Sequence, residues 1–135
     1  MDTLMVHVAS LKEIEQRFGT TTPRRQFLFA RLKLLFDDLV ATGAVKHLYL
    51  FGSLVSGKPS PNDIDLLLVM NSGFTTANLS GKTSEIFQHD ICKIRYQADV
   101  FWVTEAIGDD RIADLLDVFS RDRERQGQNI FEVRV

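Results

Sequence analysis

The chain has 135 residues and a formal net charge of -2 at pH 7, with 44% hydrophobic and 25% charged residues. This is the size of one ordinary domain with the composition of a soluble globular protein. The charge excludes nucleic-acid binding by a global basic field but leaves local basic patches open. One cysteine, Cys92, excludes an intrachain disulfide and a thiolate zinc site. Since the sequence has neither a signal peptide nor a membrane span, we expect one cytoplasmic domain over residues 1–135.

A short amphipathic segment is expected near the start of the chain, inside an N-terminal extension that covers residues 1–21. Leu11, Ile14 and Phe18 recur at helical spacing, and Gly19 ends the pattern. This spacing predicts a short helix with one apolar face.

The clearest helix is predicted over residues 22–43. Thr22 is a good N-cap, Pro23 suits the first helical position, and Gly43 supplies a C-terminal stop. Apolar residues between these signals recur at helical spacing and are expected to face the core: Phe27, Ala30, Leu34, Leu35 and Leu39.

Three apolar runs read as buried strands within a core over residues 45–103. Residues 45–51 and 63–70 have few polar interruptions and are short enough for strands, and residues 57–62 form the loop between them. Residues 98–103 are rich in aromatic and β-branched side chains, which suit a pleated surface.

The remaining segments predict a connection, two helices and a strand. Residues 71–82, rich in Ser, Thr, Gly and Asn, form either a lid or a long turn, and residues 85–94 have weak helical spacing. A helix over 105–124 and an edge strand over 129–135 complete the chain. Because helices and strands alternate, we predict an α/β (α+β) fold, with helices packed on a mixed sheet of four to five strands.

Two carboxylates one residue apart give the strongest chemical signal. In a strand, Asp63 and Asp65 project to one face while Ile64 projects to the other. The plainer interpretation is a solvated edge, but the apolar continuation of the strand would leave two repelling charges at the mouth of a buried element. A cation relieves that repulsion, so we expect Asp63 and Asp65 to bind Mg²⁺.

A small turn precedes these acids. Glycine at position 52 permits close backbone approach, and Ser53 adds a hydroxyl donor, so Gly52 and Ser53 are candidate ligands of nucleotide phosphates. Taken alone, the pair would be an ordinary turn. Lys58 is a further candidate for the phosphates, although a lysine in such a loop is more often solvated.

Two-metal catalysis needs a third acidic ligand. Asp99 heads the strand over residues 98–103, whereas Asp90 is expected on a helix. We therefore expect Asp99 to complete a site for two magnesium ions.

Other polar residues have plainer interpretations. His7, His47 and His89 lack metal-ligand spacing and are interpreted as structural. Arg24 and Arg25 either contact nucleotide, acceptor or RNA, or lie exposed at the helix end.

Gly52-Ser53, the short spacer and Asp63-Ile64-Asp65 resemble the signature of the nucleotidyltransferase superfamily, which includes DNA polymerase beta, kanamycin nucleotidyltransferase and prokaryotic minimal nucleotidyltransferases. The resemblance covers residues 45–103. It implies that Gly52 and Ser53 bind phosphates, that the two aspartates hold magnesium, and that Asp99 ligates the catalytic ion and helps to activate the acceptor hydroxyl.

The resemblance also implies an activity: binding of a Mg-nucleotide, with ATP expected, and transfer of its nucleoside monophosphate to a hydroxyl. A protein side chain in a toxin–antitoxin pair is one candidate acceptor, with a helical toxin or a second copy of the chain as partner. The alternative is a non-catalytic, antitoxin-like module that keeps the fold and binds a nucleotide or a protein. Nucleic acid stays open as a partner but is not indicated.

Overall fold

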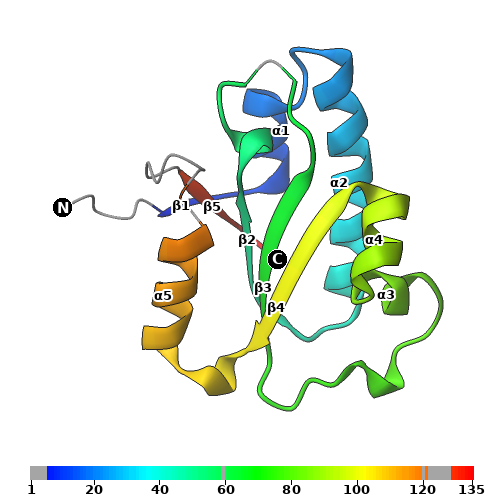
Figure 1. Cartoon of the computed structure of the whole chain (residues 1–135), viewed down its shortest axis with the longest axis vertical. Coiled ribbons are helices and arrows are strands. Elements are labelled where there is room, and N and C mark those ends of the chain that lie inside the picture. The colour runs from blue at the N-terminus through cyan, green and yellow to red at the C-terminus, as the bar shows by residue number, and fades with distance from the viewer. Residues whose placement is uncertain (1–5, 59, 120, 122–128) are drawn as a thin grey trace.

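A mixed sheet of five strands runs through the computed structural model, which describes residues 6–58, 60–119, 121 and 129–135 (Figure 1). The strand order is β1-β5-β2-β3-β4. β2 is antiparallel to both β5 and β3, whereas β1 pairs with β5 and β3 with β4 in parallel. The strands are β1 (Val6–Ala9), β2 (Val45–Phe51), β3 (Ile64–Met70), β4 (Ala98–Thr104) and β5 (Ile130–Val133).

Helices cover both faces of this sheet. The larger apolar cluster joins one face to the helices α1 (Leu11–Phe18), α2 (Pro23–Ala41), α3 (Gly81–Ile86) and α4 (His89–Tyr96). The smaller cluster joins the other face to α5 (Asp109–Phe119). Figure 1 shows α5 on the opposite side of the sheet from α2 and α4. The predicted fold class, a mixed sheet with helices packed on it, is confirmed.

Local signals explain the first two helices. Ser10 and Glu13 form a capping box at the start of α1. At the start of α2, the Thr22 hydroxyl accepts a hydrogen bond from the Arg25 N–H at 3.1 Å. Gly43, with φ +67°, follows the end of α2. Both predicted helices are therefore confirmed.

The buried face of α2 differs from the expected one. Leu35 and Leu39 are buried as predicted, but Phe27 and Leu34 are 39% and 55% exposed, and Ala30 is also exposed. The core positions are Leu28, Phe29, Leu32, Leu35 and Leu39. Because α2 carries apolar residues on most sides, spacing alone did not select the face that meets the sheet.

The C-terminal strand lies inside the sheet, so the prediction of an edge strand over residues 129–135 was wrong. β5 is flanked by β1 and β2. Ile130, Phe131 and Val133 are buried. The outer partner, β1, comes from the extension over residues 1–21, where no strand was predicted because four residues carry little periodicity.

The segment between β3 and β4 is more ordered than a plain connection. The rings of Phe74 and Phe87 both pack edge-on against Trp102, with centroids 5.3 and 5.7 Å away. This aromatic cluster holds Phe74 against the sheet, a 3₁₀ turn follows over Thr76–Asn78, and residues 81–82 belong to α3. The predicted helix over 85–94 is two helices, α3 and α4, with a break at residues 87–88.

The last helix is shorter than expected. A 3₁₀ turn over Glu105–Ile107 comes first, and Gly108, with φ +95°, separates it from α5. The predicted end at residue 124 lies outside the described residues. No helix in the described part of the chain has the length and apolarity needed to cross a membrane.

Candidate functional site

The three predicted acids meet at the beginnings of β3 and β4. Asp65 is the register partner of both Phe51 in β2 and Asp99 in β4. Asp63 directly precedes β3, where the Ile64 N–H donates to the Gln97 carbonyl at 2.9 Å. The parallel register of β3 and β4 therefore brings Asp99 to the acid pair.

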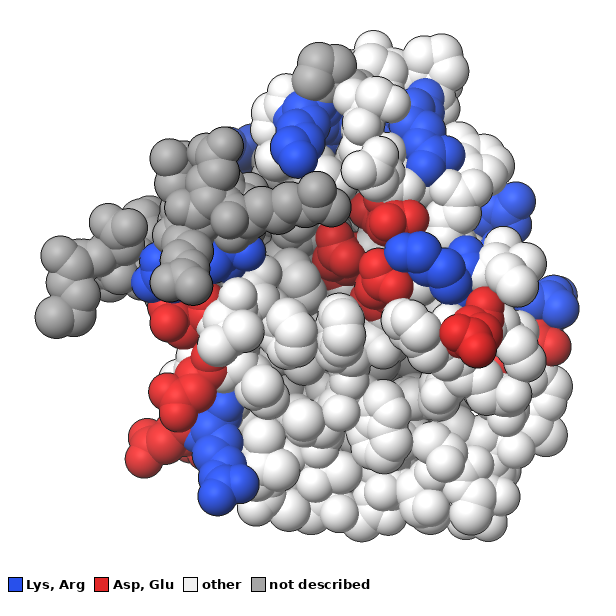
Figure 2. All heavy atoms as spheres, viewed as in Figure 1, with Lys and Arg blue, Asp and Glu red and all other residues white. Residues whose placement is uncertain are grey.

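Asp65 and its register partner Asp99 project from the face of the sheet that α5 covers. Ile64 and Leu66 belong to the cluster under α2, while Leu67 and Val69 belong to the cluster under α5. Alternation along β3 places Asp65 with the second set. Figure 2 shows acidic side chains gathered near the centre of one face, with basic side chains beside them.

A lysine that the sequence analysis did not select lies within this group. The Lys93 ammonium, from α4, is 2.7 Å from Asp99 Oδ2 and 3.0 Å from Asp63 Oδ2. Burial lowers the pKa of Lys93, but hydrogen bonds and charge attraction from Asp99 and Asp63 outweigh it, so the pKa is raised. His89, interpreted as structural, lies at the rim, with Nε2 3.8 Å from Asp99 Oδ1.

The Asp65 carboxylate is partly buried. Burial, followed by the charges of Asp99 and Asp63, raises its pKa to about 7, and the charge of Lys93 offsets this only in part. A further positive charge nearby would therefore stabilise the ionised form of Asp65.

Gly52 lies directly against this carboxylate. A Cβ built at position 52 would collide with Asp65 Oδ2, and the backbone has φ +79° and ψ -157°. Glycine is therefore required both for space and for conformation. Ser53 begins a 3₁₀ turn over Ser53–Val55, and its hydroxyl accepts the Asn62 N–H at 3.3 Å. The predicted turn and the acids thus form one site.

The loop between β2 and β3 is held by Arg25, which is only 4% exposed. Its guanidinium donates to the carbonyls of Leu54 at 2.6 Å and Ser56 at 2.9 Å, and also to those of Phe18 and Lys58. The expectation that Arg25 contacts a ligand or lies exposed was wrong. A buried guanidinium needs several acceptors, and the loop carbonyls supply them.

The neighbouring Arg24 supports the other end of the same loop. It donates to the carbonyl of Pro61 at 3.0 Å and that of Asn62 at 2.6 Å. A further bond of 2.7 Å reaches Gln97 Oε1, in the turn before β4. Arg24 therefore links the residues that precede Asp63 to those that precede Asp99.

Lys58 and Asp90 are both exposed. The Lys58 backbone N–H donates to Ser56 Oγ at 3.2 Å. Asp90 lies exposed in the first turn of α4, as expected for a helical residue. Lys93 was missed because nothing in a helical pattern marks one lysine as inward-pointing; its only signal is its place six residues before Asp99.

The donor set suits a hard divalent cation, because carboxylate oxygens are the ligands that Mg²⁺ prefers. Lys93 already stands between Asp63 and Asp99 as a cation, which indicates that positive charge is favoured at that point. Among the described residues, no group of three or more His, Cys, Asp or Glu side chains is arranged to hold an ion as it stands. Asp63, Asp65 and Asp99 are the residues available to such an ion, and the Lys93 ammonium lies between two of them.

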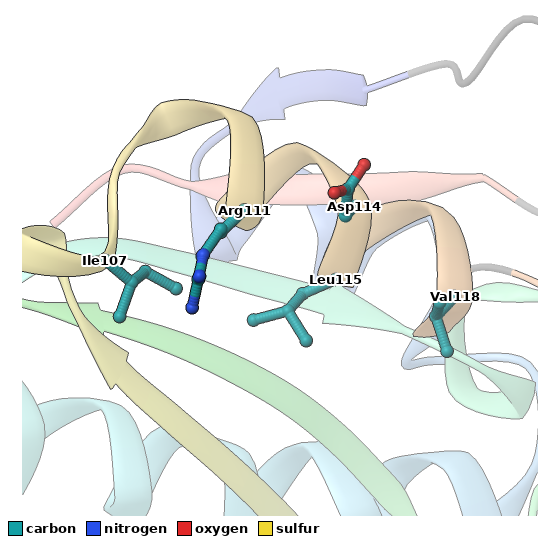
Figure 3. A pocket seen from close by; sticks show the side chains of 5 residues that line it. All are labelled: Ile107, Arg111, Asp114, Leu115 and Val118. Carbon is teal, nitrogen blue, oxygen red and sulfur yellow. The ribbon is translucent and has the colours of Figure 1, made fainter.

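Two surface hollows lie elsewhere among the described residues. One, of about 310 Å³, is lined by Ile107, Arg111, Asp114, Leu115 and Val118. Figure 3 shows Arg111 and Leu115 on one side of α5, with Asp114 pointing the other way. The second, of about 380 Å³, lies between α2 and α4. Neither hollow is lined by Asp63, Asp65 or Asp99. The candidate site is therefore defined by the clustering of these three carboxylates and by the register of β3 and β4.

Comparison with known proteins identifies a family for the chain but assigns no activity to it. The model of a family described as "Family of unknown function (DUF6932)" matches residues 3–134. No curated protein and no solved structure matches the chain.

Proposed function

The chain belongs to DUF6932, a family of unknown function, and we propose from its site residues that it is a magnesium-dependent nucleotidyltransferase. The substrate is a nucleoside triphosphate, with ATP expected, and the product is a nucleoside monophosphate joined to a hydroxyl acceptor. In this reaction the acceptor oxygen bonds to the α-phosphorus, the bond from that phosphorus to the bridging oxygen breaks, and pyrophosphate leaves.

One observation carries the proposal. Asp65 and Asp99 are register partners on adjacent strands, and Asp63 reaches the same lysine ammonium as Asp99. Three carboxylates thus share one region beside a turn whose glycine leaves no room for a side chain. This is the charge arrangement that a magnesium-bound triphosphate requires.

Each residue has a role in the proposal. Asp63, Asp65 and Asp99 hold the metal, and Asp99 also accepts the proton of the acceptor hydroxyl. The Ser53 hydroxyl accepts the Asn62 N–H, which leaves its own proton for a phosphate oxygen. When bound, magnesium supplies neutralisation of charge on the phosphates and a lower pKa for a bound hydroxyl. Positioning and charge neutralisation account for most of the catalysis.

The acceptor is proposed to be a hydroxyl on a macromolecule. The side chains of Asp63 and Asp99 are 30% and 21% exposed, so a large acceptor can approach them. A protein partner in a cytoplasmic toxin–antitoxin pair is one such acceptor, because a side-chain hydroxyl on its surface could reach these carboxylates. A second copy of the chain is the other candidate partner.

Transfer of label tests the proposal. The chain is incubated with α-labelled ATP, magnesium and a lysate of its host, and label bound to macromolecules is counted. We expect transfer by the wild type, none with chelator, and none by Asp63→Asn or Asp65→Asn. Asp90→Asn is the matched control, because that carboxylate is exposed on α4, and it should retain transfer. Equal labelling by the wild type and the Asp63→Asn/Asp65→Asn variant would refute the activity.

A second candidate is a binding module without catalysis. It is favoured by Lys93, which neutralises Asp63 and Asp99 without a metal. Calorimetry distinguishes the two functions: a nucleotidyltransferase should bind ATP more tightly with magnesium than without, whereas a module of this kind should show no metal dependence.

A further inference from the structure

Lys93 is placed in the acid group by the path of the chain. α4 ends at Tyr96, Gln97 takes a left-handed conformation with φ +52°, and β4 begins at Ala98. Cys92 and Tyr96, both buried, anchor the inner side of the helix. The Lys93 ammonium, on a flexible four-carbon stem, then reaches Asp63 and Asp99 together.

The contact is close enough to compete with a metal. The ammonium lies 2.7 Å from Asp99 Oδ2 and 3.0 Å from Asp63 Oδ2, within hydrogen-bonding distance. A divalent ion bound by the same oxygens would stand only a few ångströms from that ammonium, where like charges repel. Metal binding therefore requires the ion pairs of Lys93 to break.

The ammonium is also free to leave. The Lys93 side chain is 39% exposed, so the way out to solvent is open. A triphosphate brings several negative charges of its own, and magnesium in proteins is usually held jointly by one or two carboxylates and by substrate phosphates. Phosphates thus offset the cost of displacing the lysine.

We propose that Lys93 is a resident counter-ion that prevents Asp63 and Asp99 from retaining a divalent cation on their own, so that metal is retained only together with a nucleotide. It is a positioning residue, since it acts through the two carboxylates. This inference rests on the proposed function, because it assumes that the acids are metal ligands.

Titration with Mn²⁺ tests it, with free Mn²⁺ followed by electron paramagnetic resonance and no turnover needed. Without nucleotide, Lys93→Met should bind Mn²⁺ at least 10-fold more tightly than the wild type. Lys93→Arg, which keeps the charge, should resemble the wild type. With a non-hydrolysable ATP analogue, the wild type should bind Mn²⁺. The difference in Mn²⁺ affinity between the wild type and Lys93→Met should then be smaller than it is without the analogue.

Two controls accompany the titration. Lys82→Met removes the same charge from an exposed position on α3 and should leave Mn²⁺ affinity unchanged. Thermal melting checks folding, and Lys93→Gln, which keeps a hydrogen-bond donor beside the carboxylates, replaces Lys93→Met if the latter does not fold.

The outcomes separate this inference from the proposed function. If the analogue promotes Mn²⁺ binding but the wild type and the uncharged variants bind it equally without nucleotide, the role of Lys93 is refuted and the metal site stands. If no variant binds Mn²⁺ with or without the analogue, both the inference and the metal-dependent function are refuted.

Discussion

Asp65→Asn is predicted to stabilise the metal-free protein at neutral and alkaline pH. Burial and the neighbouring charges of Asp99 and Asp63 raise the pKa of Asp65 from 3.8 to about 7. An asparagine of nearly the same shape has no charge to desolvate or repel. The site would therefore be less stable with its native residue than without it, as expected where charge is kept for function.

The direction of this change in the free energy of unfolding follows from the linkage between protonation and folding. With its pKa raised in the folded state, Asp65 costs nothing below pH 3.8 and destabilises the fold increasingly as the pH rises towards about 7. At about 1.4 kcal/mol per pKa unit, the upper limit of this cost is roughly 4 kcal/mol. Because Asp65 is only partly buried, water at the cluster reduces it, and we expect about 1–3 kcal/mol at pH 8.

Urea unfolding in the presence of chelator measures the effect. The free energy of unfolding of Asp65→Asn should exceed that of the wild type at about pH 8, and the difference should shrink towards about pH 5. Asp114→Asn, an exposed carboxylate on α5, should show no such trend. A variant that is no more stable than the wild type at pH 8, or a difference independent of pH, would refute the reasoning.

Two further substitutions test how the loop between β2 and β3 is held beside the acids. Gly52→Ala should lower the free energy of unfolding by about 2–4 kcal/mol, because its Cβ would meet Asp65 and its φ is +79°, and circular dichroism during thermal melting measures this. Gly57→Ala, in the same loop with no atom within 4 Å of the added Cβ, is the control and should be nearly neutral, so equal losses would contradict the role of Gly52. Arg25→Met should cost about 3–5 kcal/mol in urea unfolding, since it strips the loop carbonyls of their buried donor. A loss under 1 kcal/mol would show that water replaces the guanidinium.

Local sequence signals were sufficient for the start of α2, for the three strands β2, β3 and β4, and for the choice of the three acids. The cap at Thr22 and the alternation of Asp63 and Asp65 act within a few residues, so their outcome depends little on the rest of the chain. Asp99 was identified because it heads a strongly apolar strand. Its pairing with Asp65 then followed from the parallel register of β3 and β4.

Other features depend on contacts between distant segments. α2 is apolar on most sides, and only packing on the sheet decided that Leu28 and Leu32 are buried while Leu34 is exposed. The interior position of β5 depends on β1, more than 120 residues earlier in the chain. Neither outcome is encoded in spacing along one segment.

The Gly-Ser turn and the shared face of an acid pair could be predicted along the chain, because turn chemistry and strand alternation are local. What surrounds them depends on how distant segments pack. Arg25 is buried beneath the loop, and Lys93 lies between Asp63 and Asp99. An ion pair forms where two side chains meet in space, and neither helical nor strand periodicity carries that information.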